Sequence, residues 1–148
     1  KGASSDDRMS VIMFGCDARP IAKLVSFSDA PDINYGGGGT SFGPPLSTAE
    51  QFLTDPASRS LMPILLLMTD GCCGDEGTAC SIMKRIDNTY KDESLQVHFV
   101  AFGQGASIEC LEQLKCQTTD GYIHTSQMGE LATTFKDIEQ SLMVAEYN

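Results

Sequence analysis

The sequence predicts an α/β protein with a doubly wound, mostly parallel, Rossmann-like sheet, helices on both faces and one antiparallel edge strand. Two observations support this fold class. From Pro63 onward, short apolar stretches alternate with segments of helical periodicity, which is the repeat of a parallel sheet with crossover helices. The chain has 148 residues, about the length of one ordinary domain, and no internal repeat divides it. We therefore expect a single domain over residues 1–148.

The elements expected before Pro63 are two strands and a helix. The stretch Met9–Phe14 is apolar enough for a buried strand, and Ile21–Phe27 alternates apolar and polar residues as an edge strand does. A tight turn joins them, so this pair should be antiparallel. The run of four glycines at 36–39 then leads into a helix with two prolines in its first turn. The apolar face expected for that helix is Leu46, Ala49, Phe52 and Leu53.

Three strand and helix pairs are expected after this. Pro63–Thr69 is apolar almost throughout, as a central parallel strand covered on both sides should be. Leu95–Phe102 and Gly121–Thr125 are the next two strands, and Ser107 is placed to cap the helix between them. The helix before Leu95 should end near residues 91–94. The apolar stripes expected for the three helices are Ile82, Met83, Ile86 and Tyr90; Ile108, Leu111 and Leu114; and Leu131, Phe135, Ile138 and Leu142.

The charge balance is acidic, with 20 Asp and Glu residues against 10 Lys and Arg residues and a formal net charge of -10. Such a field repels phosphate backbones, and no basic cluster offsets it, so nucleic acid is excluded as a partner. Acidity of this kind usually serves solubility, and it also attracts divalent cations. No apolar run is long enough to span a bilayer.

Six cysteines occur, at Cys16, Cys72, Cys73, Cys80, Cys110 and Cys116. No spacing forms a paired C-x-x-C set, which leaves a structural zinc site with little support. An even number suits disulfides in an oxidising compartment, although buried free thiols are the alternative.

Two oxygen-bearing side chains are expected at one edge of the sheet. Asp70 directly follows the most apolar strand, and Thr40 precedes a helix that should start from the same edge. Ligands of open α/β sheets bind at the carboxyl ends of the strands, and these side chains are hard oxygen donors suited to Mg²⁺ or Ca²⁺. Each residue also has a structural interpretation, because Asp70 could belong to an ordinary turn and Thr40 could cap the helix.

Catalytic chemistry finds little support in the sequence. His98 and His124 fall inside expected strands, where they are interpreted as ordinary strand residues. There is no G-x-S-x-G elbow and no P-loop, and the glycines at 103–105 lack the spacing of a dinucleotide-binding turn.

The landmarks "DRMSVIMF", "GGGGTSFGPPLSTAEQFL", "PILLLMTDG", "LQVHFVAFGQGASIECLEQL" and "GYIHTSQMGELATTFKDI" resemble, in order, those of a von Willebrand factor A domain. In that family a metal ion-dependent adhesion site (MIDAS) uses five side chains. The resemblance implies that Thr40 binds the ion directly and that Asp70 binds it directly or through water. It places Gly39, Ser41 and Gly71 at the rim of the ligand surface. A carboxylate of a protein ligand would complete the coordination of Mg²⁺ or Ca²⁺.

One landmark of the family has no match. The family begins with a strand ending in Asp-x-Ser-x-Ser and a helix, whereas "GASSDDR" precedes the first strand here. Three of the five ion-binding side chains and the central strand of the family sheet would then be missing. Unpaired buried backbone groups cost about 1–3 kcal/mol each, so we do not expect these residues to fold alone. The domain is expected to be N-terminally incomplete, with the strand supplied by an upstream segment or a neighbouring chain.

The same resemblance brings the cysteines to the metal-bearing edge. Pairing of Cys72 or Cys73 with Cys80 or Cys110 would join the loops that frame the ligand surface. The resemblance thus implies a non-enzymatic, extracellular adhesion module that binds a protein through a divalent cation. The alternatives are a structural subunit of an extracellular assembly with a vestigial metal site, a cytoplasmic scaffold domain and, last, an enzyme with a reshaped nucleotide site.

Overall fold

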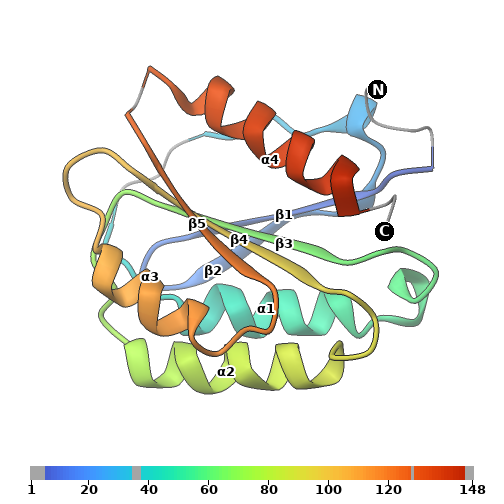
Figure 1. The fold of residues 1–148 in the computed structure, drawn as a ribbon, viewed down its shortest axis with the longest axis horizontal. Coiled ribbons are helices and arrows are strands. Elements are labelled where there is room, and N and C mark those ends of the chain that lie inside the picture. Colours follow the sequence, from blue (N-terminus) through green and yellow to red (C-terminus); the bar gives the residue numbers. More distant parts are fainter. Residues whose placement is uncertain (1–5, 35–37, 128, 146–148) are drawn as a thin grey trace.

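The computed structural model describes residues 6–34, 38–127 and 129–145, which form an α/β structure (Figure 1). The first two glycines of the glycine run and residues 2–5 of the segment before the first strand lie outside the described residues. The strands are β1 (Met9–Phe14), β2 (Ala18–Val25), β3 (Ile64–Thr69), β4 (Gln96–Phe102) and β5 (Gly121–Ser126). The helices are α1 (Gly43–Leu53), α2 (Glu76–Thr89), α3 (Ile108–Lys115) and α4 (Leu131–Ala145), with short 3₁₀ turns at Phe27–Asp29 and Pro56–Ser58.

The parallel part of the fold is the sheet β3-β4-β5. Its register is continuous, with Leu66 opposite His98 and His98 opposite Tyr122. Strand β4 lies in the middle and is buried from Gln96 to Ala101, because it has a strand on either side and helices above and below. The alternation of strand and helix from Pro63 onward is thus confirmed.

The first two strands form a separate antiparallel ribbon, as expected from the tight turn between them. Strand β2 runs over Ala18–Val25 and not Ile21–Phe27, because Phe14 already pairs with Ala18 across the turn. Among the residues described, no sheet hydrogen bonds join β1 to β3. The two strands therefore belong to different sheets in the described part of the chain.

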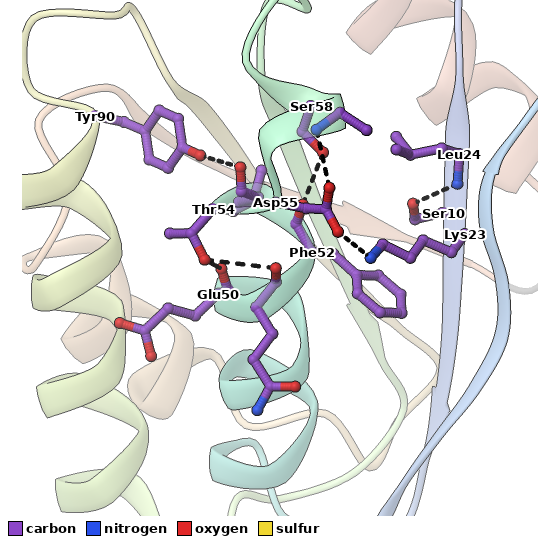
Figure 2. Close-up of polar contacts among 12 residues, drawn as sticks. Ser10, Lys23, Leu24, Glu50, Phe52, Thr54, Asp55, Ser58 and Tyr90 are labelled. Atoms are coloured by element: carbon purple, nitrogen blue, oxygen red, sulfur yellow. Dashed lines mark hydrogen bonds and ion pairs between the residues drawn. The ribbon is translucent and has the colours of Figure 1, made fainter.

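The ribbon is held to the rest of the molecule through α1. Phe14 packs edge-on against Phe42, with ring centroids 5.9 Å apart. At the other end of α1, Lys23 of β2 forms an ion pair with Asp55 (Figure 2). This contact lowers the pKa of Asp55 below its usual range, chiefly through the hydrogen bond from Lys23. Side chains, and not a shared sheet, thus position β1 and β2.

The main core lies on one face of the parallel sheet, against α1, α2 and α3 (Figure 1). Leu67, Val97 and Phe99 point into it and are almost completely buried. The stripe predicted for α2 is confirmed in full, and Tyr90 donates its hydroxyl hydrogen bond to the Leu53 carbonyl at the end of α1. Helix α2 ends at Thr89, a few residues before the predicted end, because Tyr90 closes it with backbone bonds.

The other face of the sheet is covered by α4 (Figure 1). Helix α4 packs on β5, so β3 is not covered there: Ile64 is 41% exposed and Leu66 is 39% exposed. The prediction that this strand is buried on both faces was wrong for that reason. Two predicted core residues, Ile108 and Phe135, are also exposed. No described helix is long and apolar enough to cross a membrane.

Candidate functional site

Thr40 and Asp70 come together at the carboxyl edge of β3. Asp70 follows the last residue of the strand, and Gly71 comes next. A side chain built at Gly71 would place its Cβ only 2.5 Å from the Thr40 hydroxyl oxygen. The hydroxyl therefore lies directly against the backbone that follows Asp70, and glycine is needed at position 71 for this approach.

Backbone hydrogen bonds fix the glycine loop in this position. The Gly74 amide donates to the Thr40 carbonyl at 3.0 Å, and the Ser41 amide donates to the Gly15 carbonyl at 2.8 Å. The loop is thus held between the end of β1 and the loop after β3. Gly39 lies against Cys16, because a Cβ there would be 2.7 Å from the Cys16 sulfur. The predicted rim residues Gly39, Ser41 and Gly71 all lie in these two loops.

The loop after β4 joins the same edge. The Ser107 amide donates to the Gly71 carbonyl at 3.3 Å, and a Cβ on Gly105 would be 2.6 Å from the Asp70 carbonyl oxygen. Ser107 also caps α3 as predicted, by accepting from the Cys110 amide at 3.3 Å. Three loops from separate strands therefore converge around Asp70.

Thr40 is not the cap of α1, so that structural interpretation is wrong. Helix α1 begins at Gly43, and no local side chain caps it. Instead, the Asp75 carboxylate accepts from the Phe42 amide at 2.7 Å and from the Gly43 amide at 2.8 Å. A negative charge at this position also favours the positive end of the helix dipole. The sequence analysis did not identify Asp75, whose single signal is an acidic residue after a glycine.

The side-chain oxygens of Thr40 and Asp70 are available to bind a ligand. Among the described residues, none forms a hydrogen bond or ion pair with either side chain, and Asp70 is exposed. Hydroxyl and carboxylate oxygens are the donors that hard divalent cations prefer. The described part of the chain holds no group of three or more His, Cys, Asp or Glu residues arranged around a metal position. The donor chemistry therefore fits a divalent cation, while two protein donors are fewer than its usual coordination.

All six cysteine thiols are unpaired in this structure. Cys16 contacts Gly39, as described above. The exposed Cys72 thiol donates to the Gly105 carbonyl at 3.4 Å, which places it at the metal-bearing edge as expected. The Cys73 thiol donates to the Asp75 carboxylate at 3.3 Å, and burial raises the pKa of both Cys73 and Cys110. Burial raises the pKa of Cys80, with smaller contributions from neighbours that include Cys73 and Cys116.

The two histidines form a pair that sequence reasoning missed. His98 Nδ1 lies 3.0 Å from His124 Nε2, and the His98 ring also stacks on Tyr122. His98 is fully buried, and its Nε2 has no partner among the described residues. Burial is the first cause that lowers the pKa of both imidazoles, whereas Asp120 near His98 and Asp137 near His124 act in the opposite direction. The pairing could have been inferred only from the β4–β5 register.

Comparison with protein families shows a match over residues 2–140 to the von Willebrand factor type A domain. A comparison with curated protein sequences found no match.

Among solved structures, similar folds include proximal thread matrix protein 1 (PTMP1) from the mussel byssus. The form with a zinc-occupied MIDAS motif has a TM-score of 0.66 and 22% identity, and the match covers 87% of this chain and 34% of that one. A second PTMP1 structure has a TM-score of 0.59 at 22% identity, with 85% and 34% of the two chains covered. The present chain thus spans about a third of the length of these proteins.

Proposed function

Because the chain belongs to the von Willebrand factor type A domain family, we propose that it is a non-enzymatic module that binds a protein ligand through a divalent cation. Thr40 and Asp70 would hold the cation at the carboxyl edge of β3. The cation would be the electrophile that attracts an acidic side chain of the ligand. The observation that carries the proposal is the close approach of the Thr40 hydroxyl to Gly71, where an added Cβ would lie 2.5 Å from the hydroxyl oxygen.

The division of roles between Asp75 and Thr40 supports this proposal. Asp75 satisfies the amides at the start of α1, so the Thr40 hydroxyl is not needed for capping. Gly71 lets the Thr40 hydroxyl lie against the backbone, and that hydroxyl has no hydrogen-bond partner among the described residues. Binding of a ligand explains this arrangement better than local structure does. Mg²⁺ and Ca²⁺ suit the two oxygen donors best, whereas the zinc in PTMP1 makes Zn²⁺ a third cation to test.

The remaining donors and the missing strand require a partner. We propose that a segment outside these residues, or a neighbouring chain, pairs with the free edges of β1 and β3. The same pairing would cover Ile64 and Leu66, which are exposed on the outer face of β3. Added strands gain affinity from main-chain hydrogen bonds and specificity from alternate side chains.

Direct titration tests the cation site. Mg²⁺, Ca²⁺ and Zn²⁺ are added separately to the wild type and to Thr40→Val, Asp70→Asn and Asp92→Asn variants, and binding is measured by calorimetry after all thiols are blocked. We expect Thr40→Val and Asp70→Asn to weaken binding at least tenfold, because each removes one of two protein donors. Asp92 lies after α2, away from the carboxyl edge of β3, and serves as the control. Equal affinities in all four proteins would contradict the proposal.

A second candidate function is that of a structural subunit of an extracellular assembly. The open edges of β1 and β3 favour it, because a neighbouring chain could pair with them without any cation. Binding to a partner in the presence of EDTA separates the two functions. Loss of binding supports the cation-dependent module, and unchanged binding supports the structural subunit. Both functions place the protein outside the cell.

A further inference from the structure

A cavity opens at the carboxyl ends of β4 and β5, beside the loop that contacts Asp70. Its volume is about 350 Å³, at the lower end of the range for small-ligand sites. Helices α3 and α4 leave these strand ends toward opposite faces of the sheet (Figure 1), and the start of each helix lines the cavity. Ligands of open α/β sheets bind at this edge, so the cavity is well placed for one.

Backbone hydrogen bonds hold the walls of the cavity. The Gly103 amide donates to the Ser126 carbonyl at 3.3 Å and so joins the ends of the two strands. The Glu130 amide donates to the Gln127 carbonyl at 2.9 Å, and the Glu130 carbonyl accepts from the Thr133 amide at 2.9 Å. All of these residues except Thr133 line the cavity. The backbone around the cavity is therefore already held before any ligand binds.

Part of the wall is apolar. Ala101 is 4% exposed and belongs to the main core, and Ala106 packs against that core. Ile108, the first residue of α3, adds exposed apolar surface to the same cavity. An aliphatic chain that covers these side chains would remove apolar surface from water, which is favourable.

The rest of the wall carries oxygen atoms that are free to accept hydrogen bonds. Thr125, Gln127 and Glu130 contribute a hydroxyl, an amide and a carboxylate. In the part of the chain that the structure describes, no residue forms a hydrogen bond or ion pair with any of these three side chains. Glu130 is the one charged residue among the described residues that line the cavity. The cavity thus combines apolar surface with acceptors and a negative charge.

The charge around the cavity favours a cation. The starts of two helices would by themselves attract an anion, but an acidic residue already complements each of them. Glu130 directly precedes α4, and Glu109 lies in the first turn of α3. The whole chain also has a formal net charge of -10, which attracts basic ligands.

We propose that this cavity binds an arginine side chain of the protein ligand. The aliphatic stem would pack on Ala106 and Ile108, as the stems of basic side chains do on apolar surface. The guanidinium group would donate to the Glu130 carboxylate and to the side-chain oxygens of Thr125 and Gln127. Arginine suits these separate acceptors better than lysine, because its donors are more numerous and are spread over a rigid plane.

The cavity and the cation site share the loop between β4 and α3. A Cβ on Gly105 would be 2.6 Å from the Asp70 carbonyl oxygen, whereas Gly103 and Ala106 of the same loop line the cavity. A ligand with an acidic side chain on the cation would therefore bring a nearby arginine to the cavity. That combination of two side chains rests on the proposed function, but the binding of arginine by the cavity does not.

Nuclear magnetic resonance titration tests the cavity in the absence of divalent cations. The nitrogen-15-labelled protein is kept in EDTA and titrated with N-acetyl-arginine methylamide, in which both termini are blocked. The corresponding lysine, leucine and glutamate compounds are titrated in parallel. We expect the arginine compound to shift the amide signals of Gly103, Ala106 and Gln127 until they saturate. The lysine compound should bind more weakly, and the leucine and glutamate compounds should cause no saturable shift.

Two variants test the role of the carboxylate. Glu130→Gln should weaken binding of the arginine compound about fivefold, as expected for the loss of a partly exposed ion pair. Glu93→Gln is the matched control, because it removes the same charge from an exposed residue that precedes the amino end of β4. This control should bind as the wild type does. The amide spectrum of each variant also shows whether it is folded.

Four results would each overturn the proposal. They are the absence of shifts at the cavity, equal binding of the lysine compound, saturable binding of the leucine or glutamate compound, and equal affinities of Glu130→Gln and Glu93→Gln. Because EDTA removes divalent cations, a failure of the cation site would change none of these results. The two proposals can therefore fail separately.

Discussion

Replacement of Asp75 by alanine should destabilise the fold because it removes the cap of α1, a helix that lies elsewhere in the chain. Its carboxylate accepts from the Phe42 amide at 2.7 Å and from the Gly43 amide at 2.8 Å, at the beginning of α1. Helix α1 contributes Leu46, which is 1% exposed, to the main core. Loss of the carboxylate thus leaves two amide donors without a partner at the point where a core helix begins.

The magnitude follows from these two contacts. A hydrogen bond to a charged group contributes about 1.5–3 kcal/mol, and loss of an ordinary helix cap costs about 0.5–2 kcal/mol. The site is only partly buried, so water can replace part of the loss. We expect Asp75→Ala to lower the free energy of unfolding by about 2–3 kcal/mol. For a chain of this length, that corresponds to a fall in Tm of about 5–10 °C.

Urea unfolding followed by far-ultraviolet circular dichroism measures the effect. Asp75→Asn should lie between the wild type and Asp75→Ala, because the amide oxygen can still accept one hydrogen bond without the charge. Glu76→Gln is the matched control: it is the next acidic residue, it is exposed, and it should change stability by no more than about 0.5 kcal/mol. If Asp75→Ala were as stable as Glu76→Gln, the capping role would be refuted.

Three further outcomes follow from the structure. Burial lowers the pKa of His98 and His124 in the folded protein, so as the pH falls these two residues bind protons in the unfolded chain before they do so in the folded one. The free energy of unfolding should therefore be constant above pH 6.5 and fall as the pH drops below it. His98→Gln should flatten that part of a urea-midpoint profile, and an unchanged profile would contradict the assignment. Gly71→Ala, whose Cβ would press on the threonine hydroxyl at 2.5 Å, should weaken divalent-cation binding at least tenfold in calorimetry. The control Gly77→Ala meets no atom within 4 Å and should bind as the wild type does. Leu67→Ala should cost about 2–5 kcal/mol in urea unfolding, and Leu66→Ala less than about 1 kcal/mol, because only Leu67 lies in the core. Equal losses would show that both faces of β3 are covered.

Much of the fold could be predicted from the sequence because its determinants are local. The period of the apolar residues indicated the strands and helices, and the prolines and Ser107 indicated where two helices begin. The shared edge of Thr40 and Asp70 was also predictable, since parallel strands end on the same side of a sheet. The absence of sheet hydrogen bonds between β1 and β3 was also expected, because the family resemblance places another strand between them, and the described residues form none there.

The tertiary structure decided which residues those elements bring into contact. Asp75 caps a helix that begins 32 residues earlier in the chain, and no local pattern encodes that contact. The exposure of Cys72 and the packing of Cys73 against the core depend on the direction in which the loop leaves β3. The exposure of Leu66 depends on where α4 packs. Periodicity along a chain reports which side of an element is apolar, but only the packing of distant elements determines what covers that side.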